Sequence, residues 1–400
     1  MTIFQKVFKV LKGDIGIWIV VFSLAMLSIV EVYSVTSTLS YRYQDGNTFY
    51  YPLKHLFFIV LGVGMMFVSS HLSYKRYYKV ADILLWISVF LLFVTLAFGT
   101  STNDARRWFT IPLLGISFQT SDLAKLTLML FVAKMLSRAQ NVPEERHACY
   151  VKCIIGVAAV CILVLPANFS TAFLIGFSSL VMLVLGRFPR KWLWTLLGVA
   201  VVFFAIYVVV VQLSGSHSRV GTWASRIESF FSSDDSGNFQ VSQSKAAIAH
   251  GGLVGAGIGG SIQRNTLPHP YSDFIFAEII EEGGLLIGLV VIVAYLFLFY
   301  RCIKIAQHVD RLFPMFLLLG LSFNIMLQAV SNMLVAVNIM PVTGQPLPFV
   351  SMGGTSLLFN FWSVGIILNI SRYTGERENV EEIEENDDVE EIVDYPFLAG

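Results

Sequence analysis

The sequence has 400 residues, of which 56% are hydrophobic and 14% are charged. Soluble domains carry roughly 25% charged residues, so this composition excludes an ordinary soluble enzyme and predicts an all-α polytopic membrane protein. The net charge is zero, but eleven of the 27 acidic residues lie within 376–400, which leaves a basic excess in the rest of the chain.

The first thirteen residues predict a short helix at the cytoplasmic membrane surface. Lys6, Lys9 and Lys12 alternate with apolar residues, and Gly13 ends the pattern. A basic amphipathic helix of this kind lies in the plane of an anionic leaflet. The apolar segment that follows lacks a small-residue cleavage site, so we expect it to stay in the protein as a spanning helix.

Residues 14–373 predict a membrane domain of ten spanning helices. A spanning helix needs about 20 mostly apolar residues, and such segments are centred near Ala25, Leu61, Phe90, Met129, Val160, Ser178, Val202, Gly288, Leu321 and Val364. Lysine and arginine are concentrated in every second connection, which predicts that those connections and both termini are cytoplasmic. The opposite side then carries one large extracytoplasmic loop, 214–273, between the seventh and eighth helices.

The large loop and the C-terminal segment show three further patterns. Apolar residues at helical spacing within 223–231 predict an amphipathic helix in the membrane interface. The run 251–260 contains GxGxxG, but no strand precedes it, so we predict a closely packed or flexible turn and neither nucleotide nor nucleic-acid binding. The acidic residues 374–400 predict a disordered cytoplasmic tail.

The stretch 267–285 joins this loop to the eighth apolar segment and carries four acids. Asp273 lies at the junction, and Glu278, Glu281 and Glu282 follow at spacing i, i+3, i+4, which places them on one helix face. Charged residues inside membrane segments are costly and usually face a protein interior or a watery cavity that serves function. The alternative is that the helix begins after Glu282 and all four acids are loop residues.

A second polar stretch, 103–125, precedes the fourth apolar segment. Arg106 and Arg107 lie on the predicted outer side, against the positive-inside trend, which indicates an anionic ligand there or contact with lipid phosphates. Asp122 and Lys125 are three residues apart within the next helix. They either line a polar cavity or form a self-neutralising pair that only holds helices together.

Polar stripes also mark the ninth and tenth apolar segments. Asn324, Gln328 and Asn332 are spaced i, i+4, i+8, and Ser356, Asn360 and Ser363 form a similar stripe. Such groups often act as interhelical packing contacts. The uncharged, proline- and glycine-rich run 340–356 between them predicts a stiff outer loop packed on protein or lining a cavity. A transporter and a membrane-embedded transferase both fit these features.

Four ordered motifs resemble the SEDS family (shape, elongation, division and sporulation). The family's ARRWI…FQPSExxK is similar to 105–109 and 118–125, and its YQxxQS to 239–244. Its LPEAHTDFIFA…EE resembles 267–277 with Glu281 and Glu282, and its LPFxSxGGxS resembles 347–356. Departures are His269 and Tyr271 beside the aspartate, Asp122 in place of a glutamate, and the loss of the family's acidic EPDxGT at 166–171.

The resemblance implies a peptidoglycan glycosyltransferase of the bacterial cytoplasmic membrane that polymerises lipid II, with Asp273 as the general base. It implies a substrate-binding set of Arg107, Lys125, Gln119, Ser121, Gln243, Ser244, Glu281, Glu282, Ser351 and Ser356. No cofactor is certain, and the candidate is a divalent cation, Mg²⁺ or Mn²⁺, held by the acids, which would supply positive charge toward the pyrophosphate in place of Arg107 and Lys125. The implied partners are a class B penicillin-binding protein transpeptidase and other membrane proteins of the divisome or elongasome.

The role of the enzyme within the family is less sharply defined by the motifs. The run 255–259 with Ser261 and Arg264 is more like the division type, FtsW, whereas 341–346 is closer to the elongation type, RodA. We favour the division type and septal wall synthesis. A lipid II flippase and a scaffold that only docks a transpeptidase stay open as alternatives without catalysis.

Overall fold

A computed structural model describes residues 13–102, 105–110, 117–213, 239–268 and 270–393. In a few stretches, among them 100–102, 105–107 and 375–393, it describes the backbone without the side chains. The amphipathic segment predicted at 223–231 and nearly all of the interfacial helix predicted at 1–13 lie outside the described residues.

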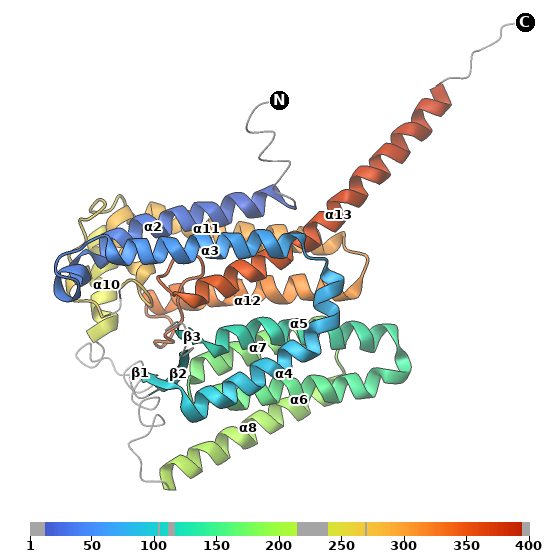
Figure 1. Cartoon of the computed structure of the whole chain (residues 1–400), viewed down its shortest axis with the longest axis horizontal. Helices are drawn as coiled ribbons and strands as arrows, with labels where there is room; N and C mark the ends of the chain where they lie inside the picture. The colour runs from blue at the N-terminus through green and yellow to red at the C-terminus, as the bar shows by residue number, and fades with distance from the viewer. Residues whose placement is uncertain (1–12, 103–104, 111–116, 214–238, 269, 394–400) are drawn as a thin grey trace, which may run out of the picture.

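The described residues form ten long helices, and each contains one of the ten apolar centres predicted from the sequence (Figure 1). They are α2 (Ile15–Tyr43), α3 (Tyr50–His71), α4 (Tyr74–Phe98), α5 (Thr120–Asn141), α6 (Arg146–Val164), α7 (Phe169–Leu185), α8 (Arg190–Leu213), α11 (Ile275–Gln307), α12 (Leu312–Ala336) and α13 (Thr355–Val393). The short elements are η1 (Pro143–Glu145), α10 (Phe239–Gly251) and η3 (Gln263–Asn265).

Six helical stretches among the described residues are long and apolar enough to cross a membrane: Ile15–Tyr41, α3, α4, Pro143–Val164, α11 and α12. The helix α7, with 17 residues, is shorter, and α5 carries charged side chains along its length. Almost all of α5 is buried by its neighbours, and a helix in that position can hold charges at membrane depth. The exact number of ten spans stays a prediction.

A small antiparallel sheet between α4 and α5 departs from the all-helical expectation. It consists of β1 (Thr100–Thr102), β2 (Ala105–Thr110) and β3 (Ser117–Gln119), in the order β1-β2-β3. Phe109 pairs with Phe118 across two strands, with ring centroids 5.8 Å apart, and such aromatic cross-strand pairs stabilise a short ladder. The sequence does not predict these strands, because segments of three to six residues are too short to show a clear periodicity.

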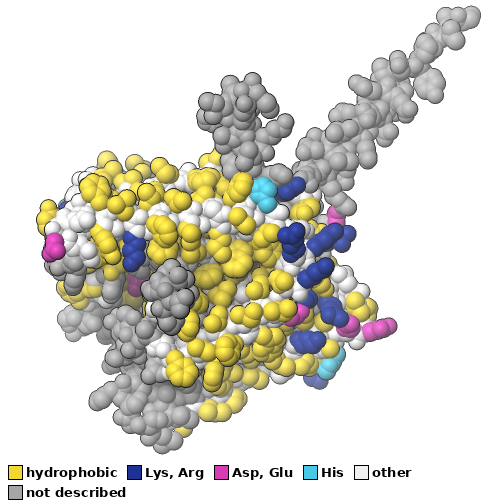
Figure 2. Space-filling model, in the orientation of Figure 1, with side chains coloured by type: hydrophobic (Ala, Val, Ile, Leu, Met, Phe, Trp, Pro, Cys, Tyr) yellow, Lys and Arg dark blue, Asp and Glu magenta, His cyan; other side chains and the backbone are white. Residues whose placement is uncertain are grey.

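The two ends of the bundle differ in charge. Figure 2 shows lysine and arginine side chains gathered at one end, while the flank between the ends is mostly hydrophobic. At that end Asp14 caps α2, forms an ion pair with Arg301 of α11 and donates its backbone N–H to Ser371 of α13. The start of α2 and the membrane part of α13 therefore meet at the basic end, whereas the sheet and α10 lie at the other end (Figure 1).

The helix α11 is broken by a residue outside helical geometry. Gly284 has φ 76° and ψ 174°, a region that is essentially restricted to glycine. The backbone groups freed by the break are paired with the loop after α10: Ala256 and Gly257 donate to the carbonyls of Glu281 and Glu282, and Leu285 donates to that of Gly252. The glycine-rich run is thus a closely packed turn, one of the two predicted forms.

The acidic C-terminal segment continues the helix α13, and the disorder predicted for 374–400 stays a prediction. The backbone of α13 continues as a helix to Val393 and projects away from the bundle (Figure 1). Glutamate is a good helix former, so the continuation agrees with local propensity. Its cytoplasmic location stays a prediction.

Candidate functional site

Asp273 lies in a turn immediately before α11, at the end of the bundle that carries the sheet. Its side chain is partly exposed and accepts a hydrogen bond from the Ser272 hydroxyl at 3.1 Å. The residues that follow it, Phe274 and Ile275, are fully buried. The chain therefore presents this carboxylate at the boundary between the packed helix and the outer loop.

The proline- and glycine-rich loop 341–354 packs against the Asp273 turn. The Ser351 hydroxyl donates to the carbonyl of Ser272 at 2.7 Å, and the Met352 N–H donates to that of Tyr271 at 2.9 Å. The loop is itself held by the Tyr295 hydroxyl, which donates to the carbonyl of Pro348. As predicted for irregular backbone near the membrane, this loop is packed into the protein.

Two amide side chains of α12 donate hydrogen bonds to the backbone of this loop. Gln328 donates to the carbonyl of Pro346 at 2.8 Å. One turn further along the helix, Asn332 donates to the carbonyls of both Asp273 and Gln345, at 2.9 and 2.8 Å. Two members of the predicted polar stripe thus bind the backbone of the outer loops.

Lys125 and Asp122 form an ion pair of 2.7 Å near the start of α5, and both are almost fully buried. The Lys125 ammonium also donates to the Gln328 side chain at 3.2 Å. Lys125 and Asp273 are therefore connected through Gln328, Pro346 and the loop that Asn332 holds. These two predicted site residues belong to one network, although they come from opposite halves of the chain.

The predicted residues around the β3–α5 junction lie beside this network. Gln119 donates to the Ser121 hydroxyl at 2.8 Å. Both line a small cavity of about 20 Å³ together with Thr95 and Asn168, whose amide nitrogen is buried. For Arg107 the structure describes the backbone in β2 but not the side chain.

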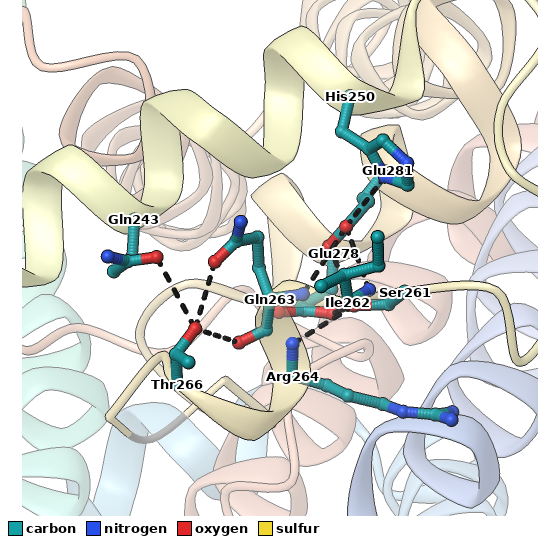
Figure 3. A network of polar contacts seen from close by, with 9 residues as sticks. All are labelled: Gln243, His250, Ser261, Ile262, Gln263, Arg264, Thr266, Glu278 and Glu281. Carbon is teal, nitrogen blue, oxygen red and sulfur yellow. Dashed lines mark hydrogen bonds and ion pairs between the residues drawn. The ribbon is translucent and has the colours of Figure 1, made fainter.

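The three glutamates of α11 lie inside the helix and are almost completely buried, so the alternative that the helix starts after Glu282 is wrong. The Ser261 hydroxyl oxygen lies within hydrogen-bond distance of both Glu278 (2.7 Å) and Glu281 (2.6 Å), and its one hydrogen can be donated to either carboxyl group (Figure 3). Glu281 also accepts from the backbone N–H groups of Ile262 and Gln263 and contacts His250 of α10. Glu278 and Glu281 therefore bind the protein's own outer loop.

Other predicted residues also contact the protein itself. Glu282 accepts from Ser34 of α2, Ser244 donates to the carbonyl of Ala336 at 2.7 Å, and Gln243 accepts from Thr266 at 3.3 Å (Figure 3). Ser356 is buried at the start of α13. Of the predicted set, the structure brings Asp273, Ser351 and Lys125 into one network and places the glutamates and Gln243 in a second, around Ser261.

The sequence reading did not assign Asn332, Gln345 or His250 to a site. Asn332 was visible only as part of a polar stripe, because its two partners are distant in the sequence. Gln345 and His250 lie in an irregular loop and a short helix, where periodicity carries no signal.

Within the described residues, no three histidine, cysteine, aspartate or glutamate side chains are arranged to hold a metal ion. The buried acids of α11 instead have hydroxyl, backbone N–H and histidine partners.

The fold and the site define a polytopic helical membrane protein with a partly exposed carboxylate held at one end of the bundle by buried polar side chains. A family profile described as "Cell cycle protein", covering FtsW, RodA and SpoVE, matches residues 15–376. The chain belongs to this family, as the sequence motifs indicated, and is a multi-pass bacterial membrane protein.

Relatives cover nearly the whole chain. A probable peptidoglycan glycosyltransferase FtsW from Coxiella burnetii is 31% identical over 369 residues, covering 89% of this chain and 96% of that protein. Stage V sporulation protein E from Bacillus subtilis is 30% identical over 376 residues, covering 92% and 99%.

Solved structures share the fold. A chain from a peptidoglycan synthase complex that coordinates polymerisation and crosslinking has a TM-score of 0.67 at 24% identity, covering 90% of this chain and 98% of that one. The rod shape determining protein RodA of Thermus thermophilus has a TM-score of 0.63 at 23% identity, covering 90% and 97%.

Proposed function

We propose that this chain is a peptidoglycan glycosyltransferase that polymerises lipid II at the outer face of the cytoplasmic membrane, with Asp273 as general base. The observation that carries the proposal is the partly exposed Asp273 carboxylate on a turn fixed from two sides by Ser351 and Asn332. Relatives named peptidoglycan glycosyltransferases that align over most of the chain support the same activity.

The chemistry needs one base. The donor's pyrophosphate is already an activated leaving group, so the acceptor's sugar hydroxyl can displace it directly with inversion at the anomeric carbon. The new bond joins the acceptor oxygen to that carbon, the carbon–pyrophosphate bond breaks, and the hydroxyl proton passes to the Asp273 carboxylate. A retaining glycosidase would need a second carboxylate as nucleophile.

As the pyrophosphate leaves, negative charge develops on its oxygens, and nearby cationic side chains stabilise that charge in the transition state. We assign this role to Lys125 and Arg107, and contacts to the rest of the substrate to Gln119, Ser121, Ser351 and Ser356. Glu281, Glu282, Gln243 and Ser244 bind neighbouring parts of the chain, which supports a role in shaping the outer loop.

The division role, with septal wall synthesis, fits the FtsW-named relatives, and the RodA-like elongation role is the alternative. A class B penicillin-binding protein transpeptidase is the proposed partner, because one structural neighbour comes from a complex of polymerisation and crosslinking. The proposed orientation places both termini in the cytoplasm and the loop 214–273 outside.

Asp273→Asn should abolish glycan synthesis while leaving lipid II binding close to that of the wild type, because the amide cannot accept the proton. The measurement is lipid II polymerisation in detergent by the purified protein, with and without the co-purified transpeptidase. Detergent has no second compartment, so a flippase would yield no glycan and a scaffold would neither polymerise nor transport. Equal activity in wild type and variant would remove Asp273 as the base.

A further inference from the structure

One buried side chain joins the Asp273 turn to the rest of the outer end. Asn332 of α12 is completely buried. Its amide nitrogen donates to the carbonyl of Asp273 at 2.9 Å and to the carbonyl of Gln345 at 2.8 Å. The two hydrogens of one amide group thus connect two loops that are 72 residues apart in sequence.

The position of this amide is well determined by its surroundings. Its helix, α12, is buried on most of its faces, including Ala329, Met333 and Ala336 around Asn332. The second loop is fixed in turn, because Gln345 donates to the Thr171 hydroxyl of α7 at 2.6 Å. A rigid donor therefore acts on the Asp273 backbone from inside the bundle.

The same turn is held from its other side by Ser351 through the carbonyl of Ser272. Two adjacent carbonyls, those of Ser272 and Asp273, consequently point to different donors from different segments. Their directions set the orientation of the peptide planes on both sides of the Asp273 α-carbon, and so the direction in which its side chain leaves the backbone.

We propose that Asn332 is a positioning residue that holds the Asp273 carboxylate in its reactive orientation by binding the main-chain carbonyl of the same residue. The inference rests on the proposed function of Asp273. Displacement of a reacting group by about 1 Å can cost about a hundredfold in rate. Loss of the Asn332 amide should therefore affect the chemical step more than substrate binding.

The competing interpretation is that Asn332 only packs helices together, as buried amides in membrane proteins often do. The chain offers a matched control in Asn369 of α13. This asparagine is also completely buried, donates to a backbone carbonyl, that of Ser70, at 2.8 Å, and has a buried side-chain oxygen without a described partner, like Asn332. It lies at the basic end, away from the Asp273 turn.

The test compares Asn332→Leu, Asn369→Leu, Asp273→Asn and wild type in lipid II polymerisation, with the thermal midpoint measured for each protein. Leucine is close to asparagine in shape but has no donor. We expect Asn332→Leu to lower kcat at least about tenfold with KM for lipid II within about threefold. Asn369→Leu should lose comparable stability but keep kcat within about twofold.

Asn332→Ser is a second, milder variant for the case in which Asn332→Leu does not fold, because the serine hydroxyl keeps one donor. The kcat of Asn332→Ser should lie between that of the wild type and that of Asn332→Leu. If Asn332→Leu does not fold, Asp273→Asn gives the lower limit instead. A kcat within twofold of wild type for folded Asn332→Leu, or for Asn332→Ser if only that variant folds, would overturn the inference. If Asn332 variants keep this activity while Asp273→Asn is inactive, only the positioning role of Asn332 fails. If Asp273→Asn stays active, both the positioning role and the proposed function of Asp273 fail.

Discussion

At the scale of single residues, a buried ion pair on α5 has partners on the same helix and on a neighbouring helix. Asp122 and Lys125 are one turn apart on α5, and Gln328 of α12 provides a further acceptor for the ammonium. The structure thus contains the self-neutralising pair that the spacing indicated. Pairing and a role toward substrate are compatible, because the ammonium has three donors.

Lys125→Met should destabilise the protein by about 3 kcal/mol or more, because the Asp122 carboxylate is left buried without its cation. The double variant Asp122→Leu, Lys125→Met should recover most of that loss, since no uncompensated charge remains. Thermal or denaturant unfolding of the purified protein in detergent measures both effects. A double variant as unstable as the single one would show that the pair is not coupled.

Lys134→Met is the matched control for this experiment. Lys134 is another buried lysine of α5, and it pairs with Asp82. The Asp82 side chain is 42% exposed, so water can solvate it when the lysine is gone. The loss of stability should stay within about 1 kcal/mol.

At the scale of elements, the outer loop that follows α10 packs against the break in α11 at Gly284. The glycine-rich run after α10 hydrogen-bonds the carbonyls that precede Gly284, and Ser261 and its neighbours bind Glu281 on the same stretch of helix. The approach is close: a Cβ added at Gly284 would lie 2.3 Å from the carbonyl oxygen of Leu253. A side chain at this position would separate the loop from the helix.

Gly284→Ala should therefore lower stability by about 2 kcal/mol or more, from backbone strain and from the clash with the loop. Gly64→Ala on α3 is the control, because its added Cβ would meet no atom within 4 Å. Replacing a helical glycine with alanine should raise stability by up to about 1 kcal/mol. Thermal midpoints in one detergent compare the two, and similar midpoints would contradict the role of the break.

At the scale of the whole molecule, the helices separate a basic end from an end that carries Asp273. Arginine and lysine side chains gather at the basic end (Figure 2). There Asp14, at the start of α2, forms an ion pair with Arg301 of α11 and a hydrogen bond with Ser371 of α13. The positive-inside rule assigns this end to the cytoplasm. In the proposed function, the opposite end faces the lipid-linked substrate outside the cell.

Single-cysteine labelling tests this orientation in a background where the four native cysteines are replaced. Asn47→Cys, in the exposed connection between α2 and α3, should react with a membrane-impermeant maleimide in intact spheroplasts. Glu144→Cys, in the exposed connection between α5 and α6, should react only after permeabilisation. The reverse pattern would invert the topology and move Asp273 to the cytoplasmic face.

Whereas the structure decided that the α11 glutamates are buried inside the helix, the sequence by itself determined the helical membrane class, the position of each long helix and the basic end. These properties are local, because hydropathy and the 3.6-residue period act over a single helix. It could not predict the sheet at 100–119, the break at Gly284 or the double contact of Asn332. The strands of the sheet have only three to six residues, too few for a periodic signal. The break and the Asn332 contacts depend on backbone groups from distant segments, and only tertiary packing brings the donors of α12 to the carbonyls of the Asp273 turn.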